Sequence, residues 1–177
     1  MSAASLGQAR QLLQENEPEQ LVAGLLGMVL AEQSSGFELT QAERAFVLLA
    51  EGDGLTVRTA VDRLGRPLAD ARVSQSVCRG VLEGGEPVAV LDASLTEGLA
   101  AQASIADLNL RTLMCVPLAA RGQRLGVLYV DSRAVVTTFT RKDLELLMAI
   151  AAHASLAIAN ATLYAESRRR GDELEKA

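Results

Sequence analysis

Aromatic side chains, histidine and cysteine are all scarce in this sequence. Its 177 residues include no Trp, three Phe, two Tyr, one His and two Cys. So few aromatic rings leave no stacking platform for the bases of a nucleic acid. One histidine cannot form a two-histidine metal site. His153 lies in an alanine-rich stretch, where we interpret it as a residue on a helix face. We therefore expect no metal site and no histidine-based catalytic group.

An excess of basic residues and a long apolar run are also missing. The 22 acidic side chains outnumber the 17 basic ones, and the net charge is −5, which argues against binding to phosphate backbones. No uninterrupted apolar run reaches the ~18 residues of a membrane span. The first residues lack the basic start and apolar core of a secretory signal. We expect a cytoplasmic protein that binds neither nucleic acid nor membrane.

The chain is long enough for one domain with its own core. Hydrophobic residues make up 49% of it, and a chain of this length buries most of the surface that it exposes when unfolded. We expect the domain in residues 36–165, preceded by helices in residues 1–35 and followed by a linker in residues 166–177.

Hydrophobic periodicity and turn residues predict alternating helices and strands before residue 105. The expected elements are helices at residues 5–15 and 16–33, strands at residues 45–50 and 55–61, a helix at residues 70–83, a strand at residues 87–91 and a small helix at residues 94–102. Glycines at positions 52 and 54 predict a turn between the first two strands. Gly84 and Gly85 predict the end of the middle helix.

The most informative stretch is residues 111–165. Two apolar runs, residues 112–119 and 124–130, flank the polar turn of residues 120–123, which predicts a β-hairpin. Thr140 and Asp143 then have the spacing of a capping box, so we expect a helix to start there.

That helix is apolar on two sides. One stripe consists of Leu144, Leu147, Met148, Ala151, Ser155 and Ile158, and the other of Ile150, Ala154, Ala157, Ala161 and Tyr164. We expect the first stripe to cover a sheet. We expect the second to pack against the helix of residues 19–33 and against a second copy of the chain. After Tyr164 the stripes fade, and Gly171 disfavours a continuing helix by ~1 kcal/mol.

Three segments resemble a known family. RTLMCVPLAARGQRLGVLYVDS and FTRKDLELLMAIAAHASLAIANATLY resemble the closing half of a GAF domain, and SVCRGVLEGGEPVAVLDAS resembles its middle. The resemblance implies an α+β fold, GAF/PAS-like. Its antiparallel sheet of five to six strands lies between helices, and long N- and C-terminal helices pack together.

The same resemblance implies a non-catalytic sensor or regulatory domain. Its setting would be a bacterial signal-transduction or transcription-regulatory protein, such as a two-component system. The implied partners are a second copy of the chain, a small-molecule effector and an output domain of the kinase, cyclase or transcription-activator kind.

A pocket is the one site that the resemblance implies. The family holds small ligands between one sheet face and the middle helices. By resemblance, the pocket lining is Cys78, Asp92, Ser104, Leu108, Arg111 and Cys115. The ligand and any cofactor stay unknown at this point. The same positions would equally well form a closed core, and this alternative stays open.

The two cysteines support an alternative function, a small thiol-based redox switch or enzyme. Arg79 follows Cys78, and its charge favours a thiolate there. Free cysteines are more often small buried residues, however, and the spacing of Cys78 and Cys115 is neither CxxC nor that of a metal site. An enzymatic branch of the family, the free-methionine sulfoxide reductases, has a Phe-Pro-Gly-His-like approach to the Val-Pro-Leu strand. That approach has no counterpart in ASIADLNLRTLMCVPL, so we expect no enzymatic activity.

Overall fold

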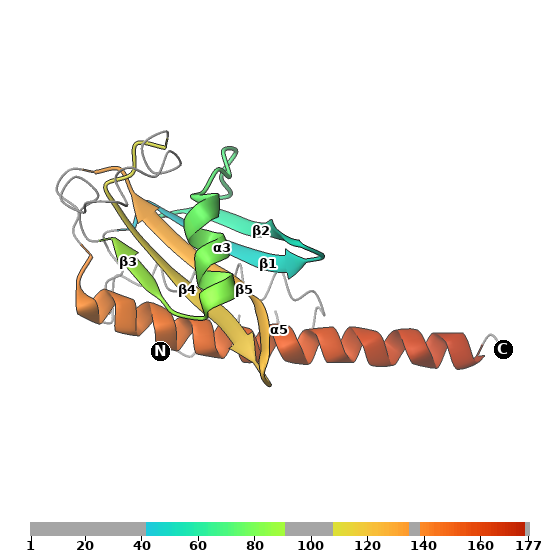
Figure 1. Ribbon diagram of the computed structural model, residues 1–177. Helices are drawn as coiled ribbons and strands as arrows, with labels where there is room; N and C mark the ends of the chain where they lie inside the picture. The colour runs from blue at the N-terminus through green and yellow to red at the C-terminus, as the bar shows by residue number, and fades with distance from the viewer. Residues whose placement is uncertain (1–41, 91–107, 135–138, 176–177) are drawn as a thin grey trace, which may run out of the picture.

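The chain forms a five-stranded antiparallel sheet with a helix on each face (Figure 1). The computed structural model describes residues 42–90, 108–134 and 139–175. The strands are β1 (Arg44–Glu51), β2 (Gly54–Asp62), β3 (Val88–Val90), β4 (Thr112–Ala120) and β5 (Gln123–Ser132), and the helices are α3 (Gln75–Gly84) and α5 (Arg141–Glu175). In the sheet the strands follow the order β2-β1-β5-β4-β3.

The predicted antiparallel sheet is confirmed among the described residues. β1 and β2 pair around the turn at Gly52, and β4 and β5 pair around the turn at Gly122. The capping box is also present, since the Asp143 N–H donates to Thr140 Oγ1 at 3.3 Å and the Thr140 N–H donates to the Asp143 carboxylate at 2.6 Å. The helices predicted in residues 5–33 and at residues 94–102 lie outside the described residues.

Strand alternation divides the core into two clusters. Leu128 and Val130 of β5 face α5 together with Met114 and Val116 of β4. Val127 and Tyr129 of β5 face α3 together with Leu113 and Cys115 of β4, and with Val77 and Val81 of the helix. The middle strands are therefore buried on both faces, and three of the candidate pocket residues, Cys78, Leu108 and Cys115, belong to the α3 side.

The middle helix begins at Gln75, not at Asp70 as the sequence indicated. The Arg72 carbonyl accepts a hydrogen bond from the Arg44 guanidinium at 3.3 Å, and the Asp70 carboxylate binds the Arg72 backbone and side chain. These contacts with β1 and within the turn hold residues 70–73 outside the helix. The predicted end at Gly84 and Gly85 is confirmed, because Gly85 is the left-handed C-cap with φ 76°.

α5 is longer than expected and turned differently about its axis. It continues through Gly171 to Glu175, since the strong helix formers on either side outweigh the cost of one glycine. Met148, expected on the sheet side, is 44% exposed, whereas Ala154, expected on the outer side, is only 3% exposed. The side chains that face the sheet are Leu147, Ala151, Ala154, Ser155 and Ile158.

By length and composition alone, α5 could cross a membrane. The core helix of a soluble protein passes the same test, and 33% of the stretch in question is buried inside the domain. Leu147 and Ile158 pack against β4 and β5 side chains in one cluster. We therefore describe α5 as the covering helix of this sheet.

β5 passes close to β1 at Gly126. A Cβ there would overlap the Leu48 carbonyl oxygen, so Gly126→Ala should lower the free energy of unfolding by about 3 kcal/mol through backbone displacement. Gly80→Ala is the matched control. Gly80 lies inside α3 with open space around it, and alanine there should stabilise the protein by about 1 kcal/mol. Urea denaturation measures both values, and equal effects of the two changes would contradict the close approach.

Candidate functional site

The described part of the predicted pocket is a closed face between α3 and the sheet. Cys78 on α3 and Cys115 on β4 are both buried, and both belong to the α3-side cluster. Leu108 is buried in the same cluster, while Arg111 is half-buried just before β4 and donates its N–H to the Ser132 carbonyl at 3.0 Å. Asp92 and Ser104 lie outside the described residues. The structure thus brings together three of the six predicted residues.

The two thiols are neighbours across the contact between helix and strand. A hydrogen bond to Cys78 and burial raise the pKa of the Cys115 thiol. Cys115 therefore keeps its proton at neutral pH, and the thiolate is the form that attacks disulfides and peroxides. This environment is that of a packed thiol and not that of a reactive one.

Tyr129 is the largest side chain of this face, and sequence reasoning missed it because an aromatic residue in a strand is ordinarily a core residue. Its ring packs edge-on against Phe46, with ring centroids 5.7 Å apart. Burial and the nearby Asp131 carboxylate raise its pKa. Its hydroxyl lies close to the Asp131 carboxylate and to the Ser74 backbone, but among the described residues no contact has full hydrogen-bonding geometry.

A buried ion pair lies at the edge of the same face. Arg44 donates from Nε to Asp131 Oδ1 at 2.8 Å and from Nη2 to Oδ2 at 2.5 Å, and its guanidinium carbon stands 5.0 Å from the centre of the Phe46 ring. Burial raises the pKa of Asp131, and the bond to Arg44 offsets part of that rise. Strand register would have revealed the pair, because Arg44 lies opposite Asp131.

Taken together, these groups make a packed face with a polar edge. Cys78, Cys115 and Tyr129 show no accessible surface, so they border no water-sized space. The described residues contain no cluster of three metal-ligating side chains. Both carboxylate oxygens of Asp131 accept hydrogen bonds from Arg44, so this carboxylate is not available to take a proton from a substrate. In its described part, the site is a packed apolar face with one ion pair at its edge, and it exposes no nucleophilic side chain.

Replacing Tyr129 by Phe tests this description of the face. At pH 7 the free energy of unfolding should change by less than about 1 kcal/mol, because the hydroxyl loses no hydrogen bond of full geometry among the described residues. Above pH 10 the wild type should lose stability faster than the variant, by up to about 1.4 kcal/mol per pH unit. The reason is that the raised pKa keeps the folded phenol protonated, while the unfolded phenol ionises near pH 10. The stability that this group contributes is thus complete below pH 10 and lost above it.

Urea denaturation at pH 7, 10 and 11 measures the effect, with Tyr164→Phe as the control for loss of an exposed phenol. A loss of several kcal/mol at pH 7 would show that the Tyr129 hydroxyl has a partner.

Comparisons with known proteins agree on one family. The family model of the GAF domain matches residues 33–158. No curated protein sequence matches the chain. A methyl-accepting chemotaxis protein segment superposes with a TM-score of 0.64 at 18% identity, covering 88% of this chain and 97% of the segment.

Two further solved structures are similar to this chain over most of its length. The GAF domain of a phosphoenolpyruvate-protein phosphotransferase from Coxiella burnetii superposes with a TM-score of 0.60 at 18% identity, covering 93% of this chain and 99% of that one. The free methionine-R-sulfoxide reductase of Neisseria meningitidis superposes with a TM-score of 0.61 at 20% identity, covering 93% and 95%. At such identities the likeness concerns the fold, and the similar structures include signalling domains and enzymes alike. By its family match over most of its length, this chain belongs to the GAF domain family.

Proposed function

We propose that this chain is a non-catalytic GAF sensor or regulatory domain that acts as a homodimer and passes its signal through α5. The setting would be a cytoplasmic signal-transduction or transcription-regulatory protein. The input would be a small molecule bound on the α3 side, beside the packed face of Cys78, Cys115 and Tyr129 and not within it. The observation that carries the proposal is an apolar side of α5 that faces away from the sheet and differs from the second stripe predicted above.

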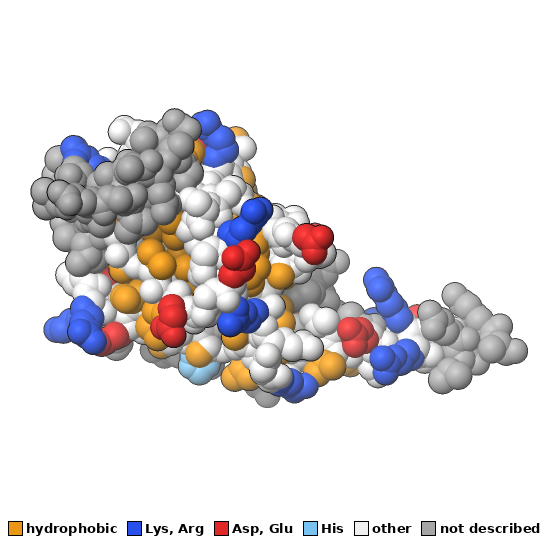
Figure 2. Space-filling model, in the orientation of Figure 1, with side chains coloured by type: hydrophobic (Ala, Val, Ile, Leu, Met, Phe, Trp, Pro, Cys, Tyr) orange, Lys and Arg blue, Asp and Glu red, His pale blue; other side chains and the backbone are white. Residues whose placement is uncertain are grey.

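Most of the large hydrophobic side chains that are exposed among the described residues lie on α5. Four of the five lie there, namely Met148, Leu156, Leu163 and Tyr164. Figure 2 shows hydrophobic side chains along this helix as well as over the body of the domain. Apolar residues also repeat at intervals of three and four, at Ala149, Ala152, Leu156, Ala159 and Leu163. This heptad spacing is that of a coiled-coil seam, and its alanines allow a second helix to approach closely. We name these five residues the outer seam.

The length of α5 also supports a role in transmission. Ile158 is the last buried residue of the helix among those described, and the helix continues for about 25 Å beyond it to Glu175. Figure 1 shows this part extending well past the sheet. In a dimer joined along the outer seam, a change in the sheet layer would alter the angle between the two helices. The predicted helices of residues 1–35 would flank the same interface.

The sequence also raised a thiol switch or enzyme, and the site geometry favours the sensor over it. Both cysteines are buried, and the pKa of Cys115 is raised. The similar structures include free methionine-R-sulfoxide reductases, which are enzymes, so the distinction calls for a direct test.

Thiol chemistry provides that test. The wild-type protein should react with a thiol reagent at neutral pH far more slowly than a free cysteine, because both sulfurs lie inside the core. Cys78→Ala and Cys115→Ala should each cost about 1–2 kcal/mol of stability through lost packing and leave the oligomeric state unchanged. Rapid modification would favour the redox switch over the sensor. Reduction of methionine sulfoxide that disappears in the double variant would favour the enzyme.

Native mass spectrometry at tens of micromolar tests the dimer and the ligand together. The wild type should appear at twice the chain mass, and a co-purified small molecule should appear as additional mass. Leu156→Glu should shift the protein to the monomer, because it buries two carboxylates in the seam, without changing the circular dichroism of the fold.

The matched control is Gln75→Glu, which adds the same charge at an exposed position of α3 and should leave the dimer intact. A wild type that stays monomeric would overturn the proposed dimer.

A further inference from the structure

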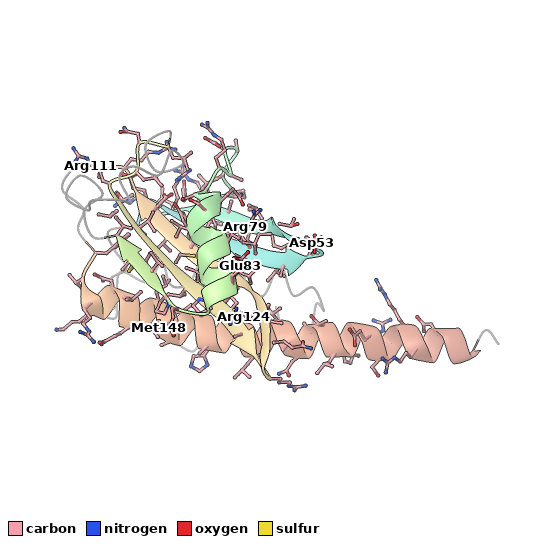
Figure 3. The ribbon with its side chains drawn as sticks, in the orientation of Figure 1. Asp53, Arg79, Glu83, Arg111, Arg124 and Met148 are labelled. Atoms are coloured by element: carbon pink, nitrogen blue, oxygen red, sulfur yellow. The ribbon has the colours of Figure 1, made fainter. Side chains whose placement is uncertain are left out.

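The hairpin between β4 and β5 carries two arginines that contact opposite helical layers. Arg124 Nη1 donates to the Leu82 carbonyl at 2.9 Å and also to the Glu83 carbonyl, both in the last turn of α3. Arg121 Nη2 donates to Asn160 Oδ1 of α5 at 3.2 Å. Figure 3 shows Arg124 beside the end of α3, near Glu83. One hairpin tip thus holds both covering helices.

The contact with α3 uses the end of the helix. The last carbonyls of a helix have no partner within the helix, and they carry the negative end of its dipole. The Arg124 guanidinium supplies both the missing donor and a positive charge. Gly85 leaves room for it, because a Cβ at that position would lie 3.3 Å from Arg124 Nη2.

A β-bulge directs Arg124 to this side. Leu118 pairs with Gly126 but Ala119 pairs with Arg124, so Leu125 is an extra residue in β5. Even-numbered residues of β5, such as Leu128, face α5. The extra residue reverses the alternation, and Arg124 joins the α3 side. Without the bulge, its side chain would leave the sheet toward α5.

Arg121 occupies a position that its backbone disfavours. Its φ is 54° and that of Gly122 is 76°, the pair of positive values that characterises a two-residue turn favouring Asn-Gly. The turn conformation therefore does not favour arginine at this position. The hydrogen bond from its side chain to Asn160 is the interaction that favours it. Asn160 lies two residues after Ile158, at the point where α5 leaves the sheet.

We propose that the hairpin tip couples α3 to α5, with Arg124 and Arg121 as its two positioning residues. When the end of α3 moves, Arg124 displaces the tip, and Arg121 passes the displacement to α5 at Asn160. This inference rests on the proposed function in assuming that α3 covers the input face and that α5 carries the signal. The coupling itself needs neither ligand nor dimer, so it can be measured separately.

Amide hydrogen exchange by NMR measures the coupling in the full chain. The variants are Arg124→Leu, Arg121→Asn and the double variant, with Arg79→Leu as the control for loss of an exposed arginine on α3. Arg121→Asn suits the turn better than arginine, so it should fold. Exchange in the last turn of α3 and around Asn160 is compared with exchange at Leu128 in the sheet, which reports on global unfolding.

Arg124→Leu should accelerate exchange about two- to five-fold both in α3 and around Asn160, as expected for the loss of one net hydrogen bond. In the Arg121→Asn background, Arg124→Leu should accelerate exchange in α3 only. Arg79→Leu should change neither region. The proposal is overturned if Arg124→Leu leaves α5 unchanged, if the effect on α5 is equal in both backgrounds, or if exchange at Leu128 rises equally. A coupled but monomeric protein would contradict the proposed function alone, and an uncoupled dimer would contradict this inference alone.

Discussion

Burial of the sheet on both faces is the constraint on which the rest of the structure depends. β5 lies between β1 and β4, and its side chains alternate between the two clusters, with Leu128 and Val130 on one side and Val127 and Tyr129 on the other. Each large apolar side chain contributes about 1.5–3 kcal/mol when buried. Loss of either covering layer would therefore expose several such residues at once. The fold needs both α3 and α5, and a change in how one of them packs is felt by strands that the other also covers.

The Arg44–Asp131 pair shows how this fold handles a polar group at the edge of its core. Removing both charges from water is expensive, and the two-point geometry with the Phe46 ring beneath it recovers part of that cost. The pair does more than balance charge. It joins β1 to β5 in one register, and the same guanidinium holds the Arg72 carbonyl. That contact helps to set where α3 begins and hence how the helix places Cys78 against Cys115.

How far the sequence predicts this structure follows from the range of the interactions. The hairpins, the Thr140 capping box and the Gly85 helix end depend on residues within a few positions of each other, and all were predictable. The start of α3 was not, because it depends on Arg44 of β1, and the partner of Asp131 is 87 positions away. The rotation of α5 was also missed, because a helix with two apolar stripes fits a sheet in more than one orientation. In the site, the resemblance placed Cys78 and Cys115 on one face, but nothing local indicated that the buried Tyr129 hydroxyl would lie beside Asp131.

Different contacts hold α5 at different points along its length. The short part just after Ile158, where burial against the sheet ends, is therefore the part that a small change can move most easily. Up to Ile158 the helix is held by the sheet. The outer seam continues to Leu163, so between these residues the helix depends on the seam and on the contact of Arg121 with Asn160. A support made of one exposed hydrogen bond is weak, worth about 1 kcal/mol at most, and weak supports are those that a small change can release. In the proposed dimer this segment lies where the sheet layer ends and the helix pair begins, so a difference of that size would be enough to shift the balance between two helix arrangements about five-fold.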